Sequence, residues 1–154
     1  DGGWAFGQPT GGGGGGGGFS DPVTGYDGSA VFGVNLAGNY STTPGGPFYL
    51  TSGPMNLSGS VSSKVRFRRW LNTDYQPYAA ATLEVSSNGS TWTTVWDNGS
   101  SAATLDSSWQ LVQYDISAVA DLQSTVYLRW GYSGAVGATA MSAWNTDDVE
   151  YLGI

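Results

Sequence analysis

The sequence predicts an all-β fold, an antiparallel two-sheet β-sandwich of the jelly-roll type with almost no helix, in a single domain over residues 1–154. Aromatic and β-branched residues recur in short runs that alternate with polar residues, which is typical of half-buried strands. Glycine, asparagine and proline separate the runs, as turns require. Helix formers are scarce, since the chain has two glutamates and one lysine. About eight to ten such runs fit a jelly roll.

The fold is organised around residues 64–96. Strands are predicted over 64–71 and 81–86, and Asn88-Gly89 suits a two-residue type I′ turn into 92–96. We expect these strands to lie in the middle of one sheet, with Trp92, Trp96 and Trp130 in the core. The alternating pattern predicts six further core residues: Val65, Phe67, Leu83, Val85, Val126 and Leu128.

Similar patterns predict the remaining strands. They cover 1–7, 31–34, 48–50, 109–116, 125–132 and 141–154. Residues 116–122 are the only helix candidate and allow at most two turns. The first segment is expected to be an edge strand, with Trp4 and Phe6 on the same side.

The composition excludes several classes of function. The net charge is −7, and four of the five basic residues lie between Lys64 and Arg69, so a distributed basic face for nucleic acid is missing. The chain has no histidine and no cysteine, which excludes a Ser-His relay, thiol catalysis and metal sites built on those residues. No apolar stretch is long enough to span a bilayer. We therefore expect a non-enzymatic protein at an extracellular or cell-surface location.

Five segments carry a family resemblance. They are W-A-F-G-Q-P-T-G-G-G, D-P-V-T-G-Y-D-G-S-A-V-F-G-V-N-L-A-G-N-Y, R-W-L-N-T-D-Y-Q-P-Y, L-E-V-S-S-N-G-S-T-W and W-N-T-D-D-V-E. With them the chain resembles the MAM-like, jelly-roll accessory domains of secreted bacterial proteins, including those of immune-inhibitor-A-type peptidases. The resemblance implies a non-catalytic extracellular module, often with a structural Ca²⁺, and implies no particular ligand. The long glycine run departs from the pattern.

Acidic and amide side chains suggest where calcium would bind. Ca²⁺ takes six to eight oxygen ligands, and loops rich in Asp, Asn and Gly supply them. The predicted ligands tie an early loop to the last strand: Asp21, Asp27, Asn35, Asp147 and Asp148. The alternative is that these side chains cap turns through their own backbone.

Two groups of residues raise the question of a ligand or substrate site. Tyr75 and Tyr78, beside Asp74, are predicted to form an exposed platform for a sugar, although aromatic loops are equally typical of protein interfaces. Glu84 and Glu150 could in principle form a glycosidase pair, but solvated strand positions are the favoured interpretation.

A basic stripe runs along the strand at 64–71. Arg66, Arg68 and Trp70 share one strand face, which would either meet an acidic surface of a second copy or pair locally with Glu84.

Eight consecutive glycines, residues 11–18, raise the question of assembly. The simplest interpretation is an exposed loop. The alternative is a close backbone contact with another subunit, which would offset the entropy cost of ordering glycines. The residues predicted for such contacts are Trp4, Phe6, Gly11, Gly18 and Ile154.

Two functions follow from these features. The favoured one is a structural subunit that assembles with copies of itself, a homopolymer forming a filament, sheath or surface layer through edge or terminal strands. The alternative is a carbohydrate-binding or adhesion module whose partner is a polysaccharide.

Overall fold

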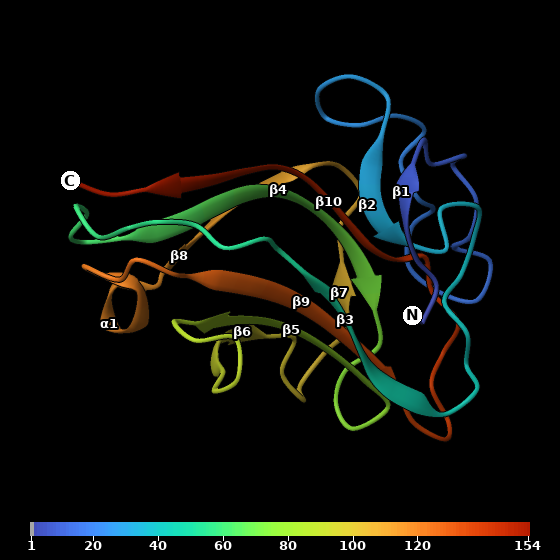
Figure 1. Cartoon of the computed structure of the whole chain (residues 1–154). Coiled ribbons are helices and arrows are strands. Elements are labelled where there is room, and N and C mark those ends of the chain that lie inside the picture. Colours follow the sequence, from blue (N-terminus) through green and yellow to red (C-terminus); the bar gives the residue numbers. More distant parts are fainter. Residues whose placement is uncertain (1) are drawn as a thin grey trace.

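Two antiparallel sheets pack face to face in the computed structural model, which describes residues 2–154 (Figure 1). The six-stranded sheet has the order β1 (Trp4–Gly7), β2 (Val31–Val34), β10 (Ala143–Leu152), β4 (Lys64–Thr73) and β7 (Thr104–Leu105), with β8 (Gln110–Asp115) also paired to β4. The four-stranded sheet has the order β3 (Gly45–Thr51), β9 (Tyr127–Gly134), β5 (Ala79–Ser86) and β6 (Thr93–Asp97). The single described helix is α1 (Ser117–Ala120). The predicted fold class is confirmed.

The core lies between the two sheets and follows the alternation of the strands. The six residues predicted from that alternation are at most 1% exposed, so this prediction is confirmed. Phe67 of β4 packs edge-to-face on Trp130 of β9, with ring centroids 5.5 Å apart. Contacts of this kind join the sheets, because each strand of an antiparallel sandwich contributes every second side chain to the interior.

The predicted arrangement of the central stretch is wrong in one respect. β4 belongs to the six-stranded sheet, whereas β5 and β6 belong to the other. Residues 74–78 therefore cross from one sheet to the other. The side chain of Asn98 supports this crossing, because its Nδ2 donates hydrogen bonds to the carbonyls of Asp74 and Ala79.

The hairpin between β5 and β6 also differs from the expected two-residue turn. Residues 87–92 form the connection, and only Gly89 of the Asn-Gly pair has a positive φ, whereas a type I′ turn needs both. The Asn88 side chain instead accepts hydrogen bonds from the backbone N–H groups of Ser90 and Thr91. This Asx-type bonding stabilises a wider loop.

A register shift in β6 changes the orientation of its tryptophans. Leu83 pairs with Trp96 and Glu84 with Thr94, so Val95 is an extra residue, as in a β-bulge. Trp96 consequently packs on the core, as predicted, but Trp92 does not. The prediction of Trp92 as a core residue is wrong because strict alternation was assumed through the bulge.

The glycine run packs against its own chain. The N–H of Gly11 donates to the carbonyl of Pro22, and the N–H of Gly14 donates to Oδ1 of Asn39. A Cβ on Gly16 would lie 2.7 Å from the carbonyl oxygen of Ala140, and one on Gly12 would collide with the Ala37 backbone. The entropy cost of ordering this run is therefore offset inside the domain, which removes the main argument for a subunit contact.

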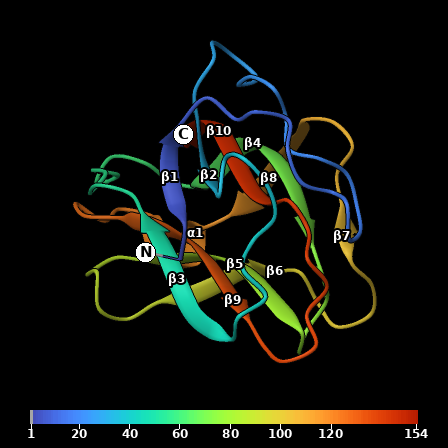
Figure 2. The same ribbon diagram turned by 90° about the vertical axis from the view of Figure 1, so that its right-hand side faces the viewer.

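The two sheets face each other at the edges formed by β10 and β3, and no further described strand fully covers this seam. β2 pairs with β10 only at Asn145 and Thr146, so β10 from Asp147 onward has no described strand on that side. β3 is the facing edge of the four-stranded sheet. β1 lies beside β3 at one end of this seam (Figure 2), where Nε1 of Trp4 donates to the carbonyl of Phe48 at 3.2 Å.

Candidate functional site

The outer face of the four-stranded sheet carries an ordered polar and aromatic cluster. Alternation along β9 sends Leu128 and Trp130 into the core and turns Arg129 outward. Glu84 of β5 lies directly opposite Arg129 in the register. Two residues of opposite charge thus occupy one cross-strand pair on this face.

Arg129 contacts one carboxylate and two aromatic rings. Its Nε donates to Oε2 of Glu84 at 2.7 Å, and Nη2 donates to Oε1 at 3.3 Å. The guanidinium carbon lies 3.8 Å from the ring centroid of Tyr49 and 4.1 Å from that of Trp92. A planar guanidinium between two aromatic rings, with a bidentate carboxylate, is fixed in orientation.

A shallow pocket of about 190 Å³ lies beside this cluster. Tyr49, Thr82, Glu84 and Ser133 line it, and Gly131 lies between them. A Cβ on Gly131 would lie 2.9 Å from the Tyr49 ring, so the glycine allows the ring to lie close to the sheet. We call Tyr49, Glu84, Trp92, Arg129 and this pocket the aromatic-arginine face. It combines apolar ring surface with hydroxyl, carboxylate and guanidinium groups.

The ligand site predicted around Tyr75 and Tyr78 is organised differently. The two rings pack edge-to-face with centroids 5.4 Å apart, and Tyr78 is exposed. Asp74 is buried, and its two carboxylate oxygens accept hydrogen bonds from the backbone N–H groups of Tyr75 and Thr139. The carboxylate therefore ties two loops together instead of facing solvent.

Some of the predicted calcium ligands are near one another. Oδ2 of Asp147 accepts hydrogen bonds from the backbone N–H groups of Tyr26 and Asp27, at 2.8 and 3.3 Å. Oδ1 of Asp147 accepts from the N–H of Asp148. Burial, together with the charges of Asp147 and Asp27, raises the pKa of Asp148. Across residues 2–154, no three acidic side chains form a group that could hold a metal ion.

Asn35 and Asp21 lie in other surroundings. The Asn35 amide donates to the carbonyl of Asn39 at 2.6 Å and so supports a local turn. Asp21 is 2% exposed, and its Oδ1 accepts a hydrogen bond from Nδ2 of Asn145 at 2.8 Å. Oδ2 of Asp21 and Oδ1 of Asn145 are buried and have no partner in the described chain. Burial raises the pKa of Asp21 to about 7.

The two glutamates do not form a pair. Glu84 is bound to Arg129 on the four-stranded sheet, and Glu150 is bound to Arg66 on the six-stranded sheet, with Nη2 and Oε2 2.6 Å apart. The expected local pairing of the basic stripe with Glu84 is wrong, because β4 and β5 lie in different sheets. Arg68 instead stacks on Tyr26, 3.7 Å from its ring centroid.

The residues predicted for assembly are scattered over the fold. Phe6 packs on Phe32, with ring centroids 4.7 Å apart, and Trp4 packs against the core. Gly11 and Gly18 belong to the run that lies on its own chain. Ile154 is exposed, although its backbone pairs with that of Val61.

Sequence reasoning did not identify the aromatic-arginine face as a site. The outward positions of Glu84 and Arg129 were visible in the alternation, but nothing in the sequence placed one opposite the other. Tyr49 lies in β3, on a different strand from Glu84 and Arg129. The alternating pattern predicts Trp92 as a core residue. The signal that was available is an arginine in a strand whose inward residues are all apolar.

Comparisons with known proteins bear on the fold. The sequence matches no protein-family model and no curated protein. The fold is similar to that of TmCBM61, solved in complex with β-1,4-galactotriose, with a TM-score of 0.50, 14% identity, and coverage of 84% of this chain and 74% of that one. A weaker match, to a structure of infectious bursal disease virus Gt strain, has a TM-score of 0.26, 14% identity and coverage of 86% and 41%. No helix within residues 2–154 has the length and apolar character needed to cross a membrane. The first match supports the β-sandwich fold of this chain.

Proposed function

We propose that this chain is a non-catalytic carbohydrate-binding module that acts outside the cell and binds a glycan on the aromatic-arginine face. The observation that carries the proposal is the position of Arg129, fixed between the rings of Tyr49 and Trp92 and bound to Glu84. A pyranose ring has an apolar C–H face, which stacks on aromatic rings, and hydroxyl groups, which need both donors and acceptors. The aromatic-arginine face offers aromatic ring surface, hydrogen-bond donors and hydrogen-bond acceptors.

The shape of the sheet supports a chain-like ligand. Both sheets bend together, and the four-stranded sheet lies on the inside of the bend (Figure 1). The outer side of β9 and β5 is therefore concave, and Thr82 and Ser133 add hydroxyls beside the pocket. Because the charged groups are already paired, binding a neutral sugar leaves no charge without a partner.

The similarity to TmCBM61 supports the ligand class to test first. That protein was solved with β-1,4-galactotriose, so β-linked galacto-oligosaccharides are the first candidates. The two candidate glutamates, Glu84 and Glu150, lie on different sheets, which supports a binding role over hydrolysis by that pair.

The test is to map binding by NMR. We expect β-1,4-galactotriose to shift the indole N–H signal of Trp92 and the Nε–H signal of Arg129 in a saturable way. The indole signal of Trp109, which precedes β8 and packs on Trp70 of the other sheet, serves as the internal control. Saturable shifts confined to Trp109, or no shift with any of a panel of plant and bacterial glycans, would contradict the proposal.

A further inference from the structure

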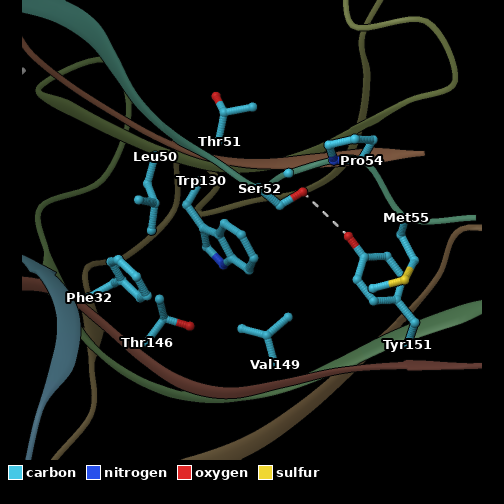
Figure 3. A pocket seen from close by; sticks show the side chains of 11 residues that line it. Phe32, Leu50, Thr51, Ser52, Pro54, Met55, Trp130, Thr146, Val149 and Tyr151 are labelled. Carbon is cyan, nitrogen blue, oxygen red and sulfur yellow. Dashed lines mark hydrogen bonds between the residues drawn. The ribbon is translucent and has the colours of Figure 1, made fainter. Parts of the chain in front are cut away.

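A cavity of about 490 Å³ lies at the open seam between β3 and β10 (Figure 3). Leu50, Phe32, Met55 and Val149 give it a largely apolar wall. No lysine, arginine, aspartate or glutamate lines it. The size suits a small molecule or a side group of a larger one.

Two of the residues that line this cavity each carry a buried hydrogen-bonding group without a described partner. Nε1 of Trp130 and Oγ1 of Thr146 are buried and find no partner within residues 2–154. Trp130 is 3% exposed and Thr146 is 1% exposed. Figure 3 shows the indole nitrogen on the side of the ring turned toward β10, where the Thr146 side chain stands. Buried polar groups are normally paired, so two such groups at one cavity indicate a missing acceptor.

The hydroxyls of Ser52 and Tyr151, which also line the cavity, already have partners. Oγ of Ser52 accepts a hydrogen bond from the backbone N–H of Leu128 at 2.9 Å and lies 3.4 Å from the hydroxyl of Tyr151. The buried groups that lack a partner at this cavity are therefore one indole N–H from the four-stranded sheet and one hydroxyl from the six-stranded sheet.

We propose that the cavity binds a neutral acyl group, an alkyl chain or methyl attached to an ester or amide carbonyl. A carbonyl oxygen has two lone pairs, and so accepts from both Trp130 and Thr146, while the alkyl part contacts Leu50 and Val149. A carboxylate is disfavoured because no cation lines the cavity. An unsubstituted sugar is disfavoured because most of its hydroxyls would face apolar walls. The proposal is independent of the aromatic-arginine face, which lies on the outside of the sheet.

The test uses methyl hexanoate as the probe and hexanoate as its charged control. We expect methyl hexanoate to move the indole N–H signal of Trp130 downfield in a saturable way, and hexanoate to have no effect at the same concentration. A Trp130→Phe variant assigns the signal among the seven tryptophans of the chain. Methyl 6-O-acetyl-galactoside, with methyl galactoside as control, distinguishes an acyl group carried on a sugar from one carried on a lipid-like ester.

A variant that keeps the shape of the cavity tests the hydrogen bond. Thr146→Val removes only the hydroxyl and should weaken binding of methyl hexanoate about fivefold, the effect of one neutral hydrogen bond. Thr93→Val, at an exposed position of β6, is the control substitution and should leave affinity for methyl hexanoate unchanged. The proposal is overturned if neither acyl probe binds, if hexanoate binds as well as its ester, or if Thr146→Val binds like the unmodified chain.

Discussion

Glu84 and Arg129 face each other across β5 and β9 and form an ion pair 2.7 Å long, with side-chain exposures of only 12% and 19%. Arg66 and Glu150 form a pair of similar length on the other sheet, at 2.6 Å, but with exposures of 37% and 51%. The fold thus offers two arginine–glutamate pairs of similar length and different burial. The buried pair is the one that lies between aromatic rings.

The buried pair is expected to stabilise the fold more than the exposed one. Arg129→Met leaves the Glu84 carboxylate largely buried without a partner and should lower the free energy of unfolding by about 1–3 kcal/mol. Arg66→Met, the matched control, should cost about 1 kcal/mol or less. Urea denaturation measures both. Equal losses in the two variants would show that the aromatic rings do not enclose the pair as described.

The glycine run should tolerate a side chain only where its backbone faces open space. A Cβ on Gly12 would collide with the Ala37 backbone, whereas one on Gly15 has no atom within 4 Å. Gly12→Ala should therefore destabilise the fold by about 1–3 kcal/mol. Gly15→Ala should be neutral or stabilising by about 0.5 kcal/mol, because alanine restricts the unfolded chain. Thermal unfolding of the two variants compares them directly. If both fold equally well, and both change the oligomeric state, the run packs against another subunit and not against its own domain.

Asp21 is expected to make stability depend on pH. Its pKa is raised to about 7 by burial, so the folded chain binds a proton that the unfolded chain has released above about pH 4. The contribution of Asp21 to the free energy of unfolding is therefore fully present below about pH 4. It is lost as the pH rises from about 4 to about 7. Asp21→Asn keeps the size and removes the charge, and should raise the unfolding free energy at pH 8 by on the order of 2–4 kcal/mol. A variant that is less stable than the unmodified chain at pH 8 would contradict this.

Calcium binding stays a prediction with its own measurement. If the oxygens of Asp27 and Asp147 hold Ca²⁺ together with backbone carbonyls, millimolar calcium should raise the melting temperature by mass action. Asp147→Asn should then abolish the rise. An unchanged melting temperature in chelator and in calcium excludes this site.

Local patterns in the sequence predicted the fold well, because alternation depends only on neighbouring residues. Val65, Phe67 and Leu128 lie in the core for that reason. The placement of β4 and β5 in different sheets could not be predicted, because it depends on the path of residues 74–78 through long-range bonds such as that from Asn98 to Asp74.

The candidate site was harder to predict than the fold. The extra residue in β6 turns Trp92 away from the core, and a bulge leaves no reliable mark in the sequence. The pairing of Glu84 with Arg129 requires the register of β5 on β9, which the sequence did not specify. Asp74 is predicted as a ligand-binding residue, but its carboxylate accepts a hydrogen bond from the Thr139 backbone. That bond joins residues 65 positions apart, so local sequence patterns could not indicate it.

The central claim is that a glycan binds on the aromatic-arginine face, and calorimetric titration of three variants with β-1,4-galacto-oligosaccharides tests it most directly. Tyr49→Ala and Trp92→Ala should each weaken binding about tenfold or more, the loss of one stacking surface. Trp109→Ala removes a half-buried tryptophan that packs on Trp70 of the six-stranded sheet, and it should leave affinity unchanged. Full affinity in Tyr49→Ala and Trp92→Ala, with loss in Trp109→Ala, would contradict the account.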